Sequence, residues 1–334
     1  MLDDNNLRMK ILLLSNQGMV EPFVGNPIMI RYRDSLYNDN RIEEVRMLRC
    51  KHPFKVIKEL RNDAKQVDLI HIHFGGLYAL VTWILLFDIN KPKIITFHGT
   101  DIHAKAIKTS KSLLEKIRIK INQYSSFISI LLYDKCGFVA EEMEKYLPFF
   151  IRKICKKKFF IQLLGVDYQL FHLMDKISAQ QHLGLKHGKY ILFSDVHNTT
   201  IKRRDIAQKI VDELPKYDLL LMCGVNSKEV PYYINASEAI LLTSDQEGSP
   251  NIIREALSLN KPVFSVDVGD ASKQLFGLKN SCIIPRNPND AALIIIENIS
   301  KEYIDNTRDM RRNILDFCFC SKKVIDIYES LLYM

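Results

Sequence analysis

Short apolar runs alternate with longer amphipathic segments from one end of the chain to the other, and few folds accept this pattern. It is typical of parallel β-sheets whose strands are connected by helices. The predicted strands are Lys10–Leu14, Val67–His73, Lys93–Phe97, Phe127–Leu132, Lys158–Leu163, Tyr190–Ser194, Tyr217–Cys223, Ala239–Thr243 and Pro262–Val266. Several end at a polar residue or a glycine, where open α/β sheets bind ligands.

The length and the charge distribution indicate two domains. A chain of 334 residues has the size of about two domains of ~150 residues each. Residues 1–165 hold 27 Lys and Arg against 17 Asp and Glu, whereas residues 166–334 hold 20 against 22. We therefore expect one domain over 1–166 and a second over 167–334. A closing helix at about 313–333 is counted with the second domain, although it could pack on either.

The net charge of +8 predicts an anionic partner, whether nucleic acid, a phosphorylated ligand or a membrane surface. Leu77–Ile89, the longest apolar stretch, is shorter than the ~20 residues that span a bilayer. The first apolar run, Ile11–Leu14, is too short for a signal peptide. The seven cysteines show no metal-ligand spacing and are expected to be reduced thiols. These features predict a cytoplasmic protein.

The segment 239–270 carries the richest chemistry: a strand, a polar loop, a helix and a second strand. Ser249 is expected to be the N-cap of the helix and Pro250 its first residue, with Arg254 opposite its apolar face. The free N–H groups of the first turn would then form a phosphate site at the end of a strand. Glu247 and Glu255 flank that site and suit hydroxyl groups better than phosphate. A sugar on a nucleotide diphosphate offers both, although the two glutamates could also be surface residues.

The residues around these glutamates resemble the signature of retaining glycosyltransferases of family 4. The resemblance rests on residues 247–257, on Asn260-Lys261-Pro262-Val263 and on Asp267-Val268-Gly269-Asp270. Further matches in the same order are residues 68–73, residues 96–101, Gly165-Val166-Asp167 before Phe171, and Lys202. The resemblance covers nearly the whole chain. It implies the α/β fold called GT-B, in which two Rossmann-like domains face each other across a cleft.

The resemblance also implies roles for single residues. Glu247 would contact hydroxyls of the donor sugar, Glu255 the nucleotide ribose, and Lys202 the diphosphate. His98 would contact a donor hydroxyl, unless it only caps a strand-to-helix turn; with Glu247 and Lys202 it forms the predicted catalytic set. The other substrate-binding residues expected from the resemblance are Gly248, Ser249, Pro250 (which has no N–H), Asn251, Ile252 and Asp101.

The chain departs from the family pattern at two places. The family has a Gly-Arg pair before the lysine, whereas this chain has Ser194-Asp195-Val196-His197, so that Arg203 could replace the arginine or Lys202 could act alone. Arg203 could equally lie in a solvated basic turn. Gly25 is the counterpart of a Gly-Gly pair in the first loop. No metal site is expected, because His71 and His73 share a strand face without a third ligand and are read as one core and one cleft-edge histidine.

The sequence thus predicts a retaining glycosyltransferase that moves a sugar from a UDP- or GDP-sugar to a glycan or lipid-linked acceptor, in surface polysaccharide or lipopolysaccharide assembly. The nucleotide-sugar is a substrate, and no cofactor is expected. The basic first domain is expected to meet the acceptor and an anionic membrane surface. Two other functions stay open: a nucleotide-sugar epimerase or hydrolase on the same fold, and a non-catalytic basic binding protein. No nucleic-acid motif is present, and no Gly-x-Gly-x-x-Gly follows the first strand, which disfavours a dinucleotide oxidoreductase.

Overall fold

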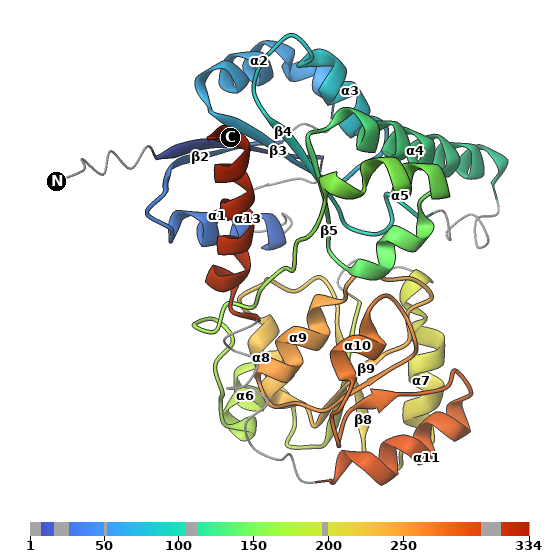
Figure 1. The fold of residues 1–334 in the computed structure, drawn as a ribbon. Helices are drawn as coiled ribbons and strands as arrows, with labels where there is room; N and C mark the ends of the chain where they lie inside the picture. Colours follow the sequence, from blue (N-terminus) through green and yellow to red (C-terminus); the bar gives the residue numbers. More distant parts are fainter. Residues whose placement is uncertain are drawn as a thin grey trace. The chain divides into compact units, whose positions relative to one another are not determined.

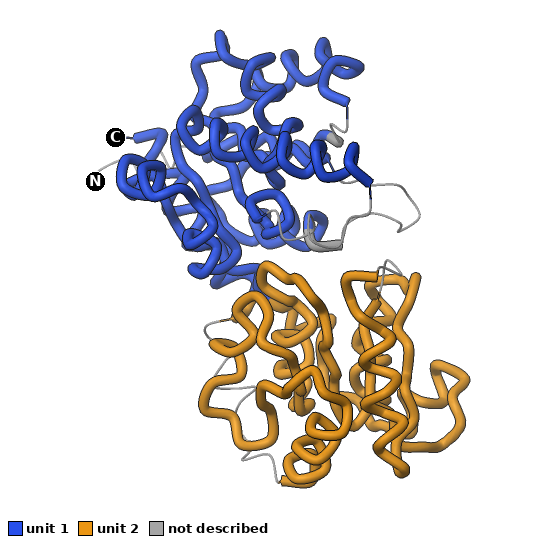
Figure 2. The backbone as a smooth tube through the Cα atoms, turned by 90° about the vertical axis from the view of Figure 1, so that its right-hand side faces the viewer, with its two compact units in different colours: residues 1–165, 317–334 blue, residues 166–316 orange. Residues whose placement is uncertain are grey.

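A computed structural model describes residues 8–16, 27–49, 52–103, 112–195, 200–301 and 315–333. The chain forms two compact units (Figure 2). Unit 1 comprises residues 1–165 together with 317–334, and unit 2 comprises residues 166–316. Each unit holds a parallel β-sheet covered by helices (Figure 1). The predicted fold class of two Rossmann-like α/β domains is therefore confirmed.

Unit 1 has a six-stranded sheet in the order β2-β1-β3-β4-β5-β6. Residues Ile11 to Leu14 of β1 are all buried, as expected for a central strand that is covered on both faces. The strands are β1 (Met9–Ser15), β2 (Ile42–Arg49), β3 (Leu69–His73), β4 (Lys93–Phe97), β5 (Lys135–Phe138) and β6 (Phe159–Ile161). The α-helices that connect them are α1 (Pro27–Tyr37), α2 (Ile57–Gln66), α3 (Leu77–Leu85), α4 (Leu113–Leu132) and α5 (Phe149–Cys155).

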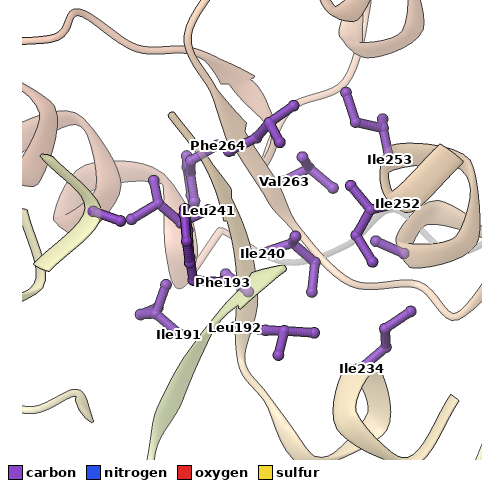
Figure 3. Close-up of a cluster of buried hydrophobic side chains, with 14 of the residues drawn as sticks. Ile191, Leu192, Phe193, Ile234, Ile240, Leu241, Ile252, Ile253, Val263 and Phe264 are labelled. Atoms are coloured by element: carbon purple, nitrogen blue, oxygen red, sulfur yellow. The ribbon is translucent and has the colours of Figure 1, made fainter. Parts of the chain in front are cut away.

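Unit 2 has a five-stranded sheet in the order β11-β10-β9-β7-β8. Its strands are β7 (Tyr190–Ser194), β8 (Asp218–Met222), β9 (Ala239–Leu242), β10 (Val263–Ser265) and β11 (Cys282–Ile283). Its α-helices are α6 (Lys176–His182), α7 (Arg204–Asp212), α8 (Val230–Ala236), α9 (Asn251–Ser258), α10 (Ala271–Leu275) and α11 (Pro288–Ile299). Phe193, Leu241 and Phe264, on three neighbouring strands, lie in one buried cluster with Ile253 of α9 (Figure 3). This packing fixes the start of α9 at the sheet edge.

Eight of the nine predicted strands lie where strands are found, within a few residues at each end. The ninth, Phe127–Leu132, is wrong, because these residues form the last turns of α4. A short apolar run does not by itself distinguish a strand from a helix end. In the helix Ile128 and Leu131 are exposed, whereas Ser129 and Ile130 are buried. The sequence reading also missed β2, β5 and β11, which are short or carry charged residues.

The C-terminal helix α13 (Phe317–Leu332) belongs to unit 1, so its assignment to the second domain is wrong. It lies beside α1 (Figure 1). Its Val324 and Ile325 are buried in one cluster with Leu13 of β1. The Tyr328 hydroxyl lies 2.8 Å from the Tyr32 hydroxyl and 2.5 Å from Nδ1 of His71. This buried polar network anchors α13 to the sheet of unit 1.

Acid should destabilise unit 1 before its carboxylates are protonated. Burial lowers the pKa of His71 to about 3, whereas an unfolded chain has a histidine pKa near 6.5. The unfolded state therefore binds the extra proton first, and stability falls as the pH drops below about 6.5. Between pH 7 and pH 5 His71 alone should cost roughly 2 kcal/mol. Urea unfolding at these two pH values tests this. His71→Gln should reduce the dependence without removing it, because burial also lowers the pKa of His73 and of His98. A wild-type midpoint that does not move would contradict it.

Candidate functional site

The candidate site lies where β7 and β9 end, since these strands are neighbours in the sheet of unit 2 and their following loops meet at one edge. Lys202 follows β7 in a short 3-10 turn (Thr200–Lys202), and Glu247 lies in the loop after β9. The Lys202 Nζ atom lies 2.6 Å from Oε1 of Glu247. The two side chains keep 27% and 16% of their surface exposed, respectively. The structure thus brings together two of the three predicted catalytic residues, in a place that solvent reaches.

Hydrogen bonds from residues that the sequence reading did not select hold both loops. The Ser244 hydroxyl donates to the same Glu247 oxygen at 2.7 Å. The Thr243 hydroxyl lies within 3.0 Å of the carbonyl oxygens of Lys202 and Arg203. Arg286 donates to the carbonyl oxygens of Thr243 and Ser244. Glu247 and Lys202 are therefore fixed before any ligand binds.

The helix start differs by one residue from the prediction. The N-cap of α9 is Pro250, α9 begins at Asn251, and no side chain caps its first turn in the described part of the chain. Ser249, predicted as the N-cap, instead donates its hydroxyl to Oδ2 of Asp270 at 2.7 Å. The same hydroxyl accepts a hydrogen bond from Arg254 at 2.6 Å. The uncapped first turn leaves the positive end of α9 open to an anion.

Arg254, which the helix pattern places opposite the apolar face of α9, is buried, with 2% of its surface exposed. Its guanidinium group donates to Ser249 and to the side-chain oxygen of Asn251. Across the loop, Gly269 has φ +59°, and a Cβ atom there would lie 2.5 Å from the carbonyl oxygen of Gly248. Only glycine fits at this position. Arg254 and Gly269 thus shape the loop from opposite ends.

Arg203 forms ion pairs within unit 2. Its guanidinium group lies 2.8 Å from Asp205 and 3.4 Å from Asp245. The hydrogen bond to Asp205 and the negative charge of Asp205 raise the pKa of Arg203. Its backbone is left-handed, with φ +56°. These partners occupy the guanidinium group, and Lys202 is the cation that lies next to Glu247.

Four more predicted residues of this segment lie within α9 or directly before it. Glu255 is buried, with 6% of its surface exposed, and Ile252 is buried in the core of the unit. Asn251 is the first residue of the helix and Pro250 precedes it. Gln246 directly precedes Glu247 in the loop after β9. Its buried side-chain nitrogen has no hydrogen-bond partner among the described residues. Gln246 is a candidate site residue that the sequence reading did not select.

In unit 1, His98 lies at the end of β4. Its Nε2 atom lies 3.1 Å from Nδ1 of His73, and its ring stacks on Phe74 at 4.0 Å. Phe74 has φ +72°, an uncommon backbone conformation for a side chain of this size. Burial lowers the pKa of His98 to about 3, so the imidazole is neutral at pH 7. A neutral imidazole can donate one hydrogen bond and accept another.

Asp101 shapes the loop that carries His98. Its carboxylate accepts hydrogen bonds from the backbone N–H groups of Gly75, His98 and Gly99 at 2.8 to 3.1 Å. Both oxygens of Asp101 thus accept hydrogen bonds from backbone N–H groups, and these bonds hold the loop in which His98 lies. Gly25, the predicted acceptor-side glycine, lies outside the described residues.

His71 and His73 are both fully buried, so the prediction that one lies at a cleft edge is wrong. His71 bonds to Tyr328 and Thr96, and its ring centroid lies 4.4 Å from that of His73. Within the described ranges, no group of three or more His, Cys, Asp and Glu side chains could hold a metal ion. In those same ranges no helix is both long enough and apolar enough to cross a membrane.

No family model matches the chain. A protein of Bacillus subtilis strain 168 that is named as a teichuronic acid biosynthesis glycosyltransferase, TuaC, is 23% identical over 279 residues. That match covers 75% of this chain and 65% of the relative, so the chain spans less than two thirds of the relative's length.

Solved structures of low sequence identity share the fold. Sucrose-phosphate synthase from Thermosynechococcus elongatus matches with a TM-score of 0.76 at 14% identity, over 97% of this chain and 99% of that one. Anabaena HepE, in complex with UDP and glucose, matches with a TM-score of 0.72 at 15% identity, over 97% and 100%. A glycosyltransferase from Rickettsia africae matches with a TM-score of 0.68 at 15% identity, over 97% and 99%. The chain has the two-domain fold of GT-B glycosyltransferases.

Proposed function

We propose that the chain is a retaining glycosyltransferase of family 4 type that transfers a sugar from a nucleotide diphosphate donor to an acceptor hydroxyl. The observation that carries the proposal is the 2.6 Å pair of Lys202 and Glu247 beside the uncapped start of α9. A cation, a carboxylate and open helix N–H groups suit a ligand with phosphates and hydroxyls. HepE, which shares the fold, was solved with UDP-glucose, and this supports a nucleotide-sugar donor.

In the proposed complex the residues of unit 2 hold the donor. Glu247 accepts hydrogen bonds from the sugar hydroxyls, and the buried Glu255 binds the nucleotide ribose. The amides of Gly248, Ser249, Asn251 and Ile252 surround the diphosphate and sugar, while Pro250 shapes the turn without donating. Lys202 has three N–H donors, so one can remain on Glu247 while the others reach the phosphate. His98, neutral at pH 7, contacts a donor hydroxyl.

The proposed reaction breaks the bond between the anomeric carbon and the diphosphate oxygen. The acceptor oxygen forms its new bond on the same face of the sugar, which retains the configuration, and the acceptor proton passes to the leaving diphosphate. Negative charge develops on the leaving group, and Lys202 stabilises that charge more in the transition state than in the ground state. No resident metal is needed for this step as proposed.

We propose a glycan or lipid-linked acceptor and a role in the assembly of surface polysaccharide or lipopolysaccharide. The relative TuaC is named for teichuronic acid biosynthesis, which supports a cell-surface polymer. The excess of positive charge in residues 1–165 supports an anionic acceptor on unit 1.

A thermal-shift screen of UDP- and GDP-sugars, followed by an assay of the best donor with a membrane extract, tests the function. We expect one donor class to stabilise the protein and its sugar to appear in an extract component. Turnover of the donor without any acceptor would instead indicate an epimerase or a hydrolase. A protein that neither free UDP nor free GDP stabilises would have no donor site and would overturn the proposal.

A further inference from the structure

His73 uses only one of its two ring nitrogens in a hydrogen bond. It is the last residue of β3, and its side chain is fully buried in unit 1. Its Nδ1 atom lies 3.1 Å from Nε2 of His98, which directly follows the neighbouring strand β4. Its Nε2 atom is also buried and has no hydrogen-bond partner among the described residues. A buried polar ring with an unpaired nitrogen is uncommon and needs an explanation beyond packing.

The loops after β3 and β4 are tied together around these two histidines. The Asp101 carboxylate accepts a hydrogen bond from the backbone N–H of Gly75, in the loop after β3. It also accepts one from the backbone N–H of His98, in the loop after β4. One buried carboxylate therefore sets the separation of the two loops, and His73 and His98 face each other before any ligand binds.

Phe74 holds the same imidazole from its face. Its ring centroid lies 4.0 Å from that of His98, with 24° between the two ring planes. Phe74 is buried and has φ +72°, a left-handed conformation that a bulky side chain adopts at an energetic cost. Strained residues of this kind cluster at functional sites. The ring of His98 is thus fixed in its plane by His73 and on its face by Phe74.

The proton between the two histidines can belong to either ring. Burial lowers the pKa of both, so at pH 7 each ring is neutral and carries one N–H. If His98 donated from Nε2, the proton of His73 would lie on its own Nε2, a buried N–H without an acceptor among the described residues. If His73 donates from Nδ1, its Nε2 is a lone pair instead. An unpaired buried N–H is rarer than an unpaired buried acceptor, which favours donation by His73.

We propose that His73 is a positioning residue for His98: it donates from Nδ1 to Nε2 of His98, so that His98 offers its Nδ1–H to the ligand. His98 is partly exposed, and no other described residue bonds to its ring. The ligand atom that meets this N–H must supply a lone pair, as a hydroxyl or phosphate oxygen of the donor does. The inference rests on the proposed function and deepens it, because it assigns the ring nitrogen of His98 that binds and the residue that selects it.

NMR of the full chain labelled with nitrogen-15 histidine tests the tautomer without any substrate. Protonated and unprotonated nitrogens of a neutral imidazole resonate far apart, and the chain has nine histidines to separate. The signals of the two residues are identified by their loss in His98→Gln and in His73→Asn. At pH 7 we expect both rings to carry their proton on Nδ1. A proton on Nε2 of His98 would overturn the proposal.

Rates with the donor found by thermal shift test the positioning role. His98→Gln should lower kcat/KM for the donor by about tenfold, the order of one hydrogen bond. His73→Leu should lower it by a similar factor. The double variant should be no slower than His98→Gln alone, because His73 acts through His98. His73→Asn, whose amide N–H can replace the Nδ1–H of histidine, should recover most of the rate.

Tyr328→Phe is the matched control, because it removes buried hydrogen bonds of unit 1 to Tyr32 and His71 without touching His98. It should lower stability and keep the wild-type kcat/KM. An equal loss in this control, or losses that add in the double variant, would show a merely structural effect and overturn the proposal. So would a folded His73→Asn no faster than His73→Leu, or wild-type kcat/KM in His98→Gln. If neither UDP nor GDP stabilised the wild type, the proposed function would fail, while the NMR measurement would still decide the tautomer.

Discussion

Replacing Lys202 with alanine is expected to reduce kcat for sugar transfer by about 10²–10³-fold, with a smaller effect on the KM for the donor. The reason is that the Nζ atom, held 2.6 Å from Glu247, is placed where charge develops on the leaving diphosphate. Glu247→Ala should be equally damaging, because it removes the proposed sugar contact and leaves Lys202 without its carboxylate partner. Initial rates with the donor found by thermal shift measure both effects.

Stability must be followed alongside activity. The Lys202–Glu247 pair is partly exposed, so breaking it should cost only about 1 kcal/mol or less, and both variants should remain folded by circular dichroism. Lys209→Ala, on the exposed side of α7, is the matched control and should keep wild-type kcat. Turnover at the wild-type rate in folded Lys202→Ala or Glu247→Ala would refute the site assignment.

The largest effect on stability is expected at Tyr328. Tyr328→Ala should lower the free energy of unfolding of unit 1 by about 3–5 kcal/mol, a large part of the 5–15 kcal/mol typical of a domain. The substitution empties a fully buried site and leaves the Tyr32 hydroxyl and the His71 ring without their partner. Urea unfolding followed by circular dichroism gives the difference.

Two further variants separate packing from hydrogen bonding. Tyr328→Phe keeps the ring and should cost about 1–3 kcal/mol, because only the hydroxyl contacts are lost. Tyr333→Ala, one residue beyond the end of the same helix and 53% exposed, should change stability by less than about 0.5 kcal/mol. If Tyr328→Ala unfolded at the wild-type urea concentration, α13 would not be the anchor of unit 1 that the network indicates.

The sequence predicts the layers of the fold because parallel sheets need buried strands, and buried strands show as apolar runs. It fails where that signal is weak or ambiguous. In α4 the apolar run 127–132 is only partly buried, since Ile130 is buried whereas Ile128 and Leu131 are exposed. The place of α13 depends on Tyr328 meeting His71 and Tyr32, contacts that join residues 257 and 296 positions apart. Local patterns carry no information on such pairs.

In the candidate site, too, some residues could be predicted from the sequence and others could not. Glu247 and Lys202 could be selected from motifs, but the loops that carry them are held by Thr243, Ser244 and Arg286, whose hydrogen bonds go to backbone carbonyl groups or across the loop. Burial of Arg254 was missed because the helix pattern places it opposite the apolar face, whereas the loop of Ser249 and Asn251 covers it. Side-chain bonds to loop backbone follow from the folded geometry alone.

The central claim is that a nucleoside diphosphate binds at Lys202 and the start of α9. Calorimetric titration of UDP and of GDP into the wild type and into Lys202→Ala tests it most directly. The account predicts that one of the two nucleotides binds the wild type and that its Kd rises at least about tenfold in the variant, which corresponds to about 1.4 kcal/mol. Binding of equal strength to both proteins, or no binding of either nucleotide to the wild type, would contradict it.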